Sequence, residues 1–382
     1  MKKINVAIFT SAARGLAHYV AQLIPEIKSK TNPYYVTYAG QEVDILVKEQ
    51  TDKIYQMIQN QSASSILEIV NFLKRKKINL INLHVSDTVR KMYLQYFAIM
   101  TYARYMGIPV CLTIHDVYTI ESMYIDPAAI ELLYTLGDSF IVGNESEKNK
   151  LQFYFNKKEN DIMVVPHGPY TLFNKGNYTE ESAKKELGLT GKKVILFFGQ
   201  IRPNKGLKYL IKALPIVLEK EKNTILYIST DLHLSTPELN EYLIRVEKSG
   251  ASKNIMMIKD YIPSNEVEKV FKAADLVVLP YTQVSQSGVL NLAFAFKKPV
   301  IVSNVFSEAS IINGKMGYVF PSGDYKSLAS TIMKIFSMKD LGKSMGIVGY
   351  KQSISKTSWK NAAKLTLGAY HKALSKSNLK VK

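Results

Sequence analysis

The chain has a single cysteine, Cys111, among its 382 residues, so it cannot form an intrachain disulfide bond. It has no apolar run near the ~20 residues that cross a bilayer. Its first residues, MKKINVAIFT, are typical of a first core strand and lack the pattern of a secretory signal. These absences favour a folded protein of a reducing cytoplasm. The length and the 47% hydrophobic content suit two domains better than one.

Acidic residues are scarce in the second half of the chain. Residues 1–180 carry 19 Lys and Arg against 17 Asp and Glu, whereas residues 181–382 carry 31 against 15, so most of the net charge of +18 lies there. A basic field can serve a phosphorylated ligand, an anionic membrane surface or nucleic acid. The lysines are spread along helical patterns without a nucleic-acid module signature, so an ordinary solvated surface is the favoured interpretation. Among specific ligands of this surface, an anionic lipid or a phosphate is preferred to nucleic acid.

Ten short apolar runs alternate with longer segments of helical period. The predicted strands are INVAIFT, NLINLHV, IPVCLTIHD, SFIVGN and IMVVPHG, then KVILFFG, TILYIST, IMMIKDY, DLVVLP and PVIVSN. Such alternation indicates βαβ units and parallel sheets. A polar, turn-rich segment near residues 168–190 separates the two sets. We therefore predict an α/β fold of two doubly wound, Rossmann-like domains facing a cleft, at residues 1–170 and 190–355, with a closing helix and basic tail at 356–382.

The loop after the first predicted strand, TSAARGLAHYVAQL, is a candidate ligand site. In open parallel sheets, ligands bind beyond the carboxyl ends of the strands, where loops lead into helix N-termini. Gly15 permits close backbone approach, and the following helix offers N–H groups to an anion. From this loop alone, ordinary turn chemistry is the favoured alternative.

The segment FFGQIRPNKGL places basic residues directly after a buried strand that ends at Gly199. Arg202 supplies a forked hydrogen-bond donor and Lys205 a mobile point charge, a combination that suits a diphosphate. A solvated basic turn is the alternative. Because glycines flank these basic residues at a strand end, an anion site is favoured.

His115 and Asp116 close the predicted strand IPVCLTIHD. A histidine and a carboxylate at a strand end can exchange hydrogen bonds with hydroxyls, as sugar recognition requires. They could equally be a base and its orienter, or two metal ligands. No HExxH or clustered histidine spacing occurs, so no metal site is predicted. His84 and His167 lie at comparable strand ends.

The segment GNESEK follows the predicted strand SFIVGN and marks a helix start. Asn144 can cap the helix, and Glu145 and Glu147 complement its dipole. The alternative places Glu145 or Lys148 in the cleft. The capping interpretation is favoured.

No charged residue occurs between Pro280 and Phe296, in PYTQVSQSGVLNLAFAF. The pattern predicts a strand end, a polar loop and a buried helix running to Lys297 and Lys298, whose charges suit a helix C-terminus. Amides and hydroxyls at the helix start can bind phosphate without a charged side chain. The candidate donor-binding residues here are Ser285, Gln286, Ser287, Gly288, Val289 and Leu290.

The order of these motifs resembles that of the retaining glycosyltransferases of family 4, which have the two-domain GT-B fold. The similarity covers nearly the whole chain and is strongest from about residue 140 to 325. It is carried by the glycine after the first strand, HD, NESEK, VVPHG, FFGQIRPNKGL, AADLVVLPYTQVSQSGVLNLAFAFKKPVIVSN and GYVFPSGD.

The resemblance implies transfer of a sugar from a UDP- or GDP-type nucleotide-diphosphate donor to an acceptor hydroxyl, with retention at the anomeric carbon. The N-terminal domain would bind the acceptor and the C-terminal domain the nucleotide. By the same resemblance, Gly15 would approach the diphosphate, His115 would contact the donor sugar, and Arg202 and Lys205 would hold the diphosphate. No cofactor or metal is implied, because basic groups and a helix N-terminus neutralise the leaving group.

Two departures from the family pattern concern the donor site. The family has arginine directly after the glycine, where this chain has Gln200, with Arg202 two residues on. It also has a pair of glutamates, on the donor sugar and the nucleotide ribose, where this chain has Ser285 and Ala293. The loop sequence SQSGV is similar to that of a variant branch of the family, so we expect a working enzyme with altered donor preference.

The leading hypothesis is a glycosyltransferase of bacterial surface polysaccharide or lipopolysaccharide assembly. Its partners would be a nucleotide-sugar donor, a saccharide or lipid-linked saccharide acceptor and an anionic membrane surface, with no nucleic acid. It would be cytoplasmic and peripheral at the inner face of the membrane. The segment Met92–Met106, beside Arg90 and Lys91, offers apolar surface for such contact, although packing against the core is favoured.

Two alternatives follow from the missing carboxylates. A non-catalytic pseudoenzyme would bind a sugar nucleotide without turning it over, although the basic residues retained at strand ends argue against an idle site. A sugar-nucleotide epimerase on the same fold would need acid and base carboxylates in the cleft, and the most obvious pair is absent.

Overall fold

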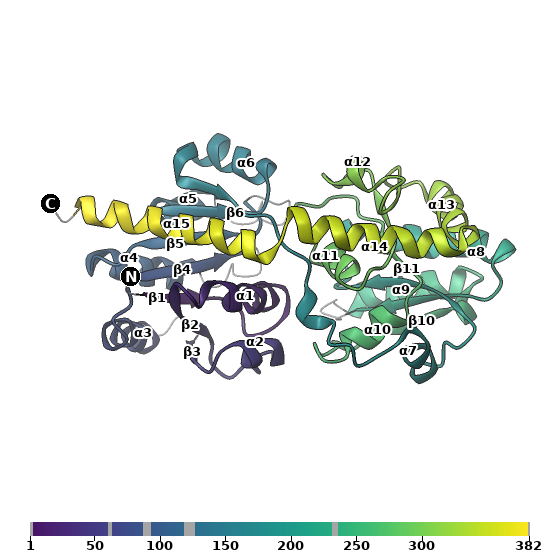
Figure 1. The fold of residues 1–382 in the computed structure, drawn as a ribbon, viewed down its shortest axis with the longest axis horizontal. Coiled ribbons are helices and arrows are strands. Elements are labelled where there is room, and N and C mark those ends of the chain that lie inside the picture. Colours follow the sequence, from purple (N-terminus) through teal and green to yellow (C-terminus); the bar gives the residue numbers. More distant parts are fainter. Residues whose placement is uncertain (1–2, 60–62, 87–92, 118–126, 231–235, 381–382) are drawn as a thin grey trace. The chain divides into compact units, whose positions relative to one another are not determined.

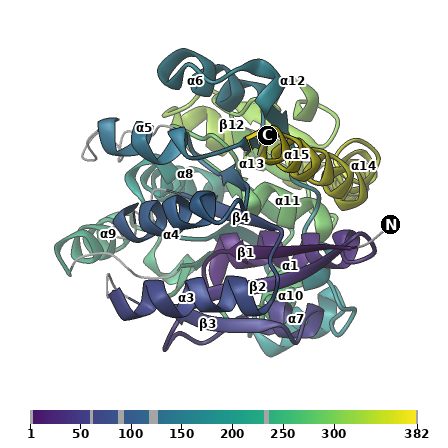
Figure 2. The same cartoon turned by 90° about the vertical axis from the view of Figure 1, so that its left-hand side faces the viewer.

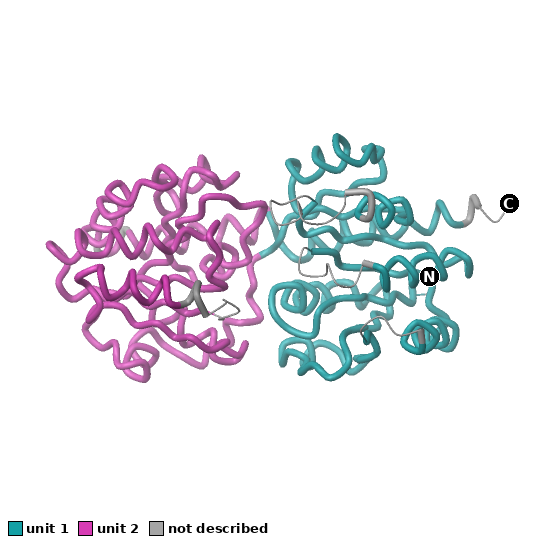
Figure 3. Tube along the Cα trace, turned by 180° about the vertical axis from the view of Figure 1, so that it is seen from behind, with its two compact units in different colours: residues 1–168, 357–382 teal, residues 169–356 magenta. Residues whose placement is uncertain are grey.

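The computed structural model describes residues 3–59, 63–86, 93–117, 127–230 and 236–380. The chain divides into two compact units, one formed by residues 1–168 and 357–382 and the other by residues 169–356 (Figure 3). The chain therefore leaves the first unit, builds the whole of the second, and then returns to the first.

The first unit is built on a seven-stranded sheet in the order β3-β2-β1-β4-β5-β6-β7, in which every pair of neighbours is parallel (Figure 1). Strands β4 and β5 are buried along their whole length, as expected where helices cover both faces of a parallel sheet. The strands are β1 Ile4–Phe9, β2 Thr31–Tyr38, β3 Ile54–Ile58, β4 Leu80–Val85, β5 Val110–Ile114, β6 Ser139–Val142 and β7 Ile162–Val164.

Helices cover both faces of this sheet. The helices are α1 Arg14–Ile27, α2 Ile45–Gln50, α3 Ala63–Arg75, α4 Tyr93–Tyr105, α5 Pro127–Thr135, α6 Glu145–Phe155, the 3-10 turn η3 Glu159–Asp161 and α15 Trp359–Lys380. Figure 2 shows α3 and α4 side by side on one face and α1 with α15 on the other. The last helix of the chain thus completes the cover of the first sheet.

The second unit is built on a six-stranded sheet in the order β10-β9-β8-β11-β12-β13, again with every pair parallel. Its core includes Ile195, Phe197, Leu226 and Val278, all almost fully buried. The strands are β8 Lys193–Phe198, β9 Thr224–Ser229, β10 Ile255–Ile258, β11 Leu276–Leu279, β12 Val300–Ser303 and β13 Gly317–Phe320.

Helix pairs flank the second sheet: α8 packs beside α13, α7 beside α10, and α11 beside α14. The helices are α7 Glu180–Glu186, α8 Leu207–Lys220, α9 Thr236–Lys248, α10 Val267–Ala273, α11 Gly288–Ala295, α12 Ala309–Ile312, α13 Tyr325–Ser337 and α14 Lys339–Lys356, with 3-10 turns η4 Thr171–Phe173, η5 Pro203–Lys205 and η6 Ser252–Asn254. The predicted fold class, two doubly wound parallel sheets, is confirmed.

Each sheet has a topological switch point where the direction of winding reverses. In the first unit it lies between β1 and β4, and in the second between β8 and β11. Ligands of doubly wound folds bind outside the carboxyl ends of the strands at such points. The loops after β1, β8 and β11 are those that carry most of the predicted site residues.

Helix α4 packs on the core, which is the favoured interpretation of its sequence. Tyr96, Ile99, Met100 and Ala103 recur at helical spacing and are buried in the first unit's core. The predicted basic flank, Arg90 and Lys91, lies outside the described residues. None of the helices in the described part of the chain combines the length and the hydropathy that a bilayer crossing needs.

Candidate functional site

Two loops of the second unit meet at the carboxyl ends of β8 and β11. Gly199, directly after β8, has φ +105° and donates its backbone N–H to Ser229 O at 2.9 Å. A Cβ added at Gly199 would lie 3.5 Å from Cγ2 of Val289, in the first turn of α11. The glycine therefore lets the basic loop after β8 lie against the start of α11.

The basic loop is fixed by a close backbone approach to the end of β11. Gly206 has φ +67°, and a Cβ there would lie 1.8 Å from the carbonyl oxygen of Pro280, so only glycine fits. Thr282 N–H donates to Asn204 O at 2.8 Å, which ties the two loops together. The Lys205 Nζ lies 3.9 Å from the centroid of the Tyr281 ring, a cation–π contact that holds this side chain beside the strand end.

The start of α11 is capped as its sequence predicts. Ser287 is the N-cap, and its hydroxyl oxygen accepts a hydrogen bond from the Leu290 amide at 3.2 Å. The amide of Leu290 is thus engaged by the cap, while the O–H of Ser287 keeps its capacity to donate to an anion. Gly288 packs against the ring of Tyr170, which a Cβ would approach to 3.4 Å.

The uncharged loop holds a buried polar atom that has no partner in the part of the chain that the structure describes. Ser285 and Gln286 are half-buried, and Gln286 Nε2 has no hydrogen-bond partner among the described residues. Buried amide groups are normally paired, so this one is suited to a ligand oxygen. Ala293, where the resemblance places the second glutamate of the family, is fully buried.

The end of α11 differs from the prediction. The helix ends at Ala295, and Lys297 adopts φ +55° beyond it, so the two lysines do not continue the helix. Lys298 is 4% exposed; its Nζ lies 3.1 Å from Glu180 Oε1 and donates to Lys272 O at 3.1 Å. Lys298 therefore joins α11 to its neighbours through a buried ion pair rather than acting as a solvated helix-end charge.

In the first unit, Gly15 lies in the first turn of α1, directly after the β1 loop. It follows Arg14, which has φ +69°, and a Cβ on Gly15 would have no heavy atom within 4 Å. Protein packing therefore does not require glycine here. The open space above this backbone is compatible with the predicted close approach of a ligand.

The three strand-end histidines of the first unit form one cluster around the buried Tyr19, with His84 buried and His115 and His167 half-buried. The Tyr19 ring centroid lies 5.6 Å from that of His84, 5.2 Å from that of His115 and 4.7 Å from that of His167. Trp359, from the start of α15, closes the cluster at 5.2 Å from Tyr19. The sequence predicted the three positions but not that they would be in contact.

Burial keeps this cluster neutral. It lowers the pKa of His115 to about 4 and that of His167 to about 3. Burial and the neighbouring His115 and His167 hold the pKa of His84 well below its usual value. At neutral pH His115 is therefore an uncharged imidazole, able to exchange hydrogen bonds with a hydroxyl.

The other interpretations of the HD segment gain no support from its contacts. His115 Nε2 lies 3.0 Å from His84 Nδ1, so this ring nitrogen is oriented by a histidine rather than by Asp116. No group of three or more His, Cys, Asp or Glu side chains in the described ranges is arranged to hold a metal ion.

The capping interpretation of GNESEK is confirmed. Asn144 Oδ1 accepts from the Glu147 amide at 2.9 Å, and Lys148 Nζ lies 2.8 Å from Glu159. Glu147 is 1% exposed; its carboxylate pairs with Lys150 at 2.6 Å and accepts from the Val117 amide at 2.8 Å. Glu147 thereby fixes the chain just after the HD segment.

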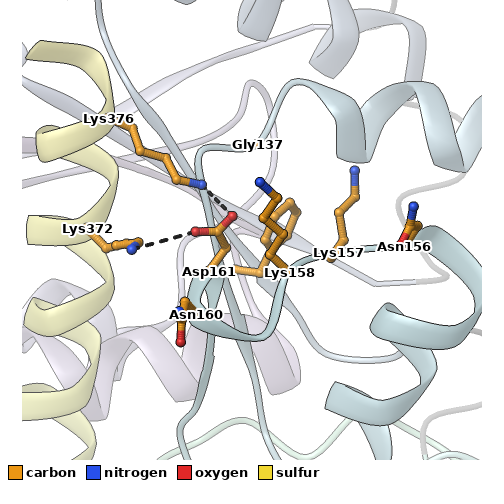
Figure 4. Close-up of a pocket in the computed structure, with 9 residues that line it drawn as sticks. Gly137, Asn156, Lys157, Lys158, Asn160, Asp161, Lys372 and Lys376 are labelled. Carbon is orange, nitrogen blue, oxygen red and sulfur yellow. Dashed lines mark ion pairs between the residues drawn. The ribbon is translucent and has the colours of Figure 1, made fainter. Parts of the chain in front are cut away.

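A pocket of about 530 Å³ lies at the opposite, amino end of the first sheet (Figure 4). It is formed by Gly137, which precedes β6, by the segment 156–161 before β7, and by α15. Figure 4 shows Lys372 and Lys376 directed at Asp161, with Nζ–carboxylate distances of 3.9 and 2.6 Å. These ion pairs fasten α15 to the unit, and none of the predicted site residues lies in this pocket.

Several residues at the candidate site carried no recognisable motif. Tyr281 lies beneath Lys205, and Tyr170 packs against Gly288. Each tyrosine is distant in sequence from the residue that it contacts, so no local motif links the two. Asn82, whose side-chain oxygen lies 3.2 Å from His84 Nε2, could have been noticed because it is a polar residue inside the apolar strand NLINLHV. Tyr19 and Trp359 occupy helical positions that are indistinguishable from ordinary core positions.

The fold of this chain matches those of solved structures, a glycosyltransferase among them. A structure of HepE from Anabaena in complex with UDP and glucose superposes with a TM-score of 0.79, at 13% identity, over 96% of this chain and 99% of that one. A glycosyltransferase from Rickettsia africae gives 0.75 at 17% identity, over 98% and 99%. The fold is therefore GT-B. The structure of a putative UDP-N-acetylglucosamine 2-epimerase from Listeria monocytogenes shares this fold, with a TM-score of 0.65 at 15% identity, over 100% of this chain and 98% of that one.

Residues 192–338 match the family glycosyl transferases group 1. The chain therefore carries a domain of that family, which lies within the second unit. This domain contains the basic loop, the uncharged loop and α11.

Curated relatives match the chain over part of their length. Spore coat protein SA of Bacillus subtilis is 26% identical over 203 residues, covering 52% of this chain and 54% of its own. The capsular polysaccharide biosynthesis glycosyltransferase CapM of Staphylococcus aureus is 26% identical over 222 residues, covering 56% of each. An uncharacterized glycosyltransferase of Methanocaldococcus jannaschii is 27% identical over 255 residues, covering 64% and 63%. The chain thus spans between half and two thirds of these relatives.

Proposed function

We propose that this chain is a retaining glycosyltransferase that moves a sugar from a nucleotide-diphosphate donor to an acceptor hydroxyl. The observation that carries the proposal is the meeting of two loops at the β8/β11 switch point. One loop brings Arg202 and Lys205, and the other brings the capped start of α11. Cationic side chains and a helix N-terminus together stabilise a departing diphosphate.

The donor site proposed here consists of Arg202, Lys205 and the segment 285–290. Lys205, which lies over Tyr281, neutralises phosphate charge. Gly288 and Val289 are the first residues of α11, and the free amides of a helix N-terminus favour an anion. In the first unit, His115 is proposed to contact a sugar hydroxyl, and Gly15 to let a phosphate group approach the backbone at the start of α1. In this scheme the leaving phosphate oxygen takes the acceptor proton, so neither a protein nucleophile nor a metal is needed.

The donor and the pathway are part of the same proposal. Structures with this fold have been solved with UDP and with UDP-glucose, which supports a nucleotide sugar as the donor class. The name of the Staphylococcus aureus relative concerns capsular polysaccharide biosynthesis, which supports a saccharide or lipid-linked saccharide acceptor in surface polysaccharide assembly. Such an acceptor would bring the enzyme to the cytoplasmic face of the membrane.

A thermal-shift screen against UDP, GDP and their sugar conjugates tests the donor class. A matched nucleotide at 100 times its Kd stabilises the native state by about 2.7 kcal/mol, so one base should raise the Tm clearly above the other. If none of these compounds changes the Tm and none is turned over, the proposal is wrong.

Substitution of Gln286 by leucine should reduce donor use without unfolding the protein. The buried Nε2 lacks a protein partner among the described residues, so Q286L removes an unpaired polar group and should leave the ligand-free protein as stable as before. If Nε2 binds a donor oxygen, kcat/KM should fall roughly three- to tenfold. Steady-state kinetics and urea unfolding measure the two effects.

Gln352→Leu is the matched control for that substitution. Gln352 Oε1 is also buried without a partner in the described part of the chain, but it lies in α14. Q352L should leave kcat/KM unchanged. Equal losses in the two variants would contradict a donor contact at Gln286.

The alternatives predict different outcomes. A sugar-nucleotide-binding pseudoenzyme would give a thermal shift and a calorimetric binding signal, but no donor hydrolysis or transfer to any acceptor. A sugar-nucleotide epimerase would interconvert donor sugars without an acceptor. The epimerase structure shares the fold alone, and the segment Pro280–Phe296 of this chain supplies no carboxylate for proton transfer.

A further inference from the structure

A series of hydrogen bonds connects Asn82 through His84 to His115. Asn82 is fully buried in β4, and its Nδ2 donates to the backbone oxygen of Cys111 at 3.2 Å and to Thr113 Oγ1 at 2.8 Å. A backbone carbonyl can only accept, so the amide nitrogen must face β5. This contact fixes the orientation of the Asn82 amide.

With the amide oriented in this way, Asn82 Oδ1 faces the interior of the cluster as an acceptor. It receives the O–H of Tyr370, from α15, at 2.8 Å. His84 Nε2 lies 3.2 Å from the same oxygen. Because Oδ1 cannot donate, His84 must carry its proton on Nε2.

The next link follows from the single proton of a neutral imidazole. Burial and neighbouring histidines keep the pKa of His84 far below neutrality, so its Nδ1 is bare when Nε2 is protonated. His84 Nδ1 lies 3.0 Å from His115 Nε2. The proton in this bond therefore belongs to His115 Nε2, which donates it to His84.

We infer that Asn82 and His84 are positioning residues that hold His115 as the Nε2–H tautomer, with a bare Nδ1 that accepts a hydrogen bond from a ligand hydroxyl. This assignment defines the direction of the hydrogen bond to a sugar: the ligand group that faces His115 Nδ1 must donate a proton to it. An acceptor such as an ether or carbonyl oxygen would find no proton there. Recognition of a sugar hydroxyl rests on the function proposed above, whereas the tautomer does not.

Nitrogen-15 NMR of the ligand-free, histidine-labelled protein tests the tautomer directly. The chain has six histidines, and H115Q identifies the signals of His115 by their loss. At pH 7 we expect His84 and His115 each to show a protonated Nε2 and an unprotonated Nδ1. A protonated Nδ1 on His115 would overturn the inference, and this measurement needs no sugar-nucleotide donor.

The variant His84→Phe then tests the positioning role. It removes the acceptor of the His115 Nε2 proton, so the His115 signals should change to those of a mixture of tautomers. The KM for the donor should rise roughly three- to tenfold, with a smaller change in kcat. An unchanged His115 spectrum in folded H84F would contradict the positioning role.

Tyr370→Phe is the matched control, because it removes one donor to Asn82 Oδ1 and leaves the His84 contact in place. It should leave the His115 tautomer unchanged. If Y370F changed the His115 nitrogen signals as much as H84F does, the conclusion that His84 fixes this tautomer would be wrong. If no sugar nucleotide binds or reacts, the proposed function fails while the NMR result still decides the tautomer.

Discussion

Lys205→Ala should lower kcat/KM for the donor by roughly 10- to 100-fold, because it removes a charge-assisted contact worth about 1.5–3 kcal/mol. Lys205 ends η5 in the loop between β8 and α8, and its side chain contacts Tyr281 just beyond β11, where the diphosphate charge of a leaving nucleotide is proposed to develop. The cation–π contact with Tyr281 keeps its Nζ at the strand end. Steady-state kinetics with the donor identified by thermal shift would measure the loss, and the Kd for the free nucleoside diphosphate should rise in parallel.

Lys297→Ala is the control for this prediction. Lys297 lies beyond the end of α11, with its Nζ 5.1 Å from the Tyr350 ring centroid, so it too makes a cation–π contact but has no proposed role in donor binding. K297A should keep donor kinetics close to those of the wild type. Equal activity of K205A and K297A would refute the diphosphate role of Lys205, and urea unfolding of both variants separates lost contacts from lost stability.

The protein should lose stability steeply as the pH falls from 6.5 toward 4. An unfolded histidine has a pKa of about 6.5, whereas the folded cluster holds His115 at a pKa of about 4 and His167 at a pKa of about 3. In this window the unfolded chain binds more protons than the native one, so the free energy of unfolding decreases as the pH decreases. The effect is at most about 1.4 kcal/mol per pH unit for each histidine, and it fades as the pH rises above 6.5 and the unfolded histidine loses its proton.

Urea unfolding at pH 7.5, 6.5, 5.5 and 4.5 measures this dependence. The near-isosteric variant His167→Phe removes one of the titrating groups and should reduce the slope of unfolding free energy against pH. His371→Asn, at an exposed histidine of α15 outside the cluster, is the control for the loss of a histidine. A stability that stays level between pH 6.5 and 4.5 would show that the cluster does not resist protonation.

All ten strands predicted from apolar runs occur in the sheets, because strands covered by helices on both faces are apolar along their length. Three strands were missed. In β2, Pro33 pairs with Val6 of β1, but pairing with β3 begins only at Tyr35 and Ile54. The missing N–H of Pro33 therefore costs no ladder bond, although a proline normally argues against an inner strand. β3 is a short strand interrupted by Gln56, and β13 has four residues and begins at a glycine, so pattern alone does not define them.

The candidate site was predictable where its chemistry lies on single loops. The basic loop after β8 and the cap at Ser287 follow from residues adjacent in sequence. The residues that contact these loops are brought there by the topology of the fold, and a local sequence pattern does not predict such long-range contacts. Tyr370 contacts Asn82 across 288 positions, and Lys298 pairs with Glu180 of α7 across 118, which is why α11 was expected to extend into those lysines.

The return of the chain to its first unit sets the order in which the protein can mature on the ribosome. Residues 169–356 form a contiguous unit that can fold as soon as they emerge. The first unit is translated earlier, yet its histidine cluster stays open until α15 brings Trp359 against Tyr19 and the hydroxyl of Tyr370 to Asn82. The half of the protein that is synthesised first is therefore the half that is completed last.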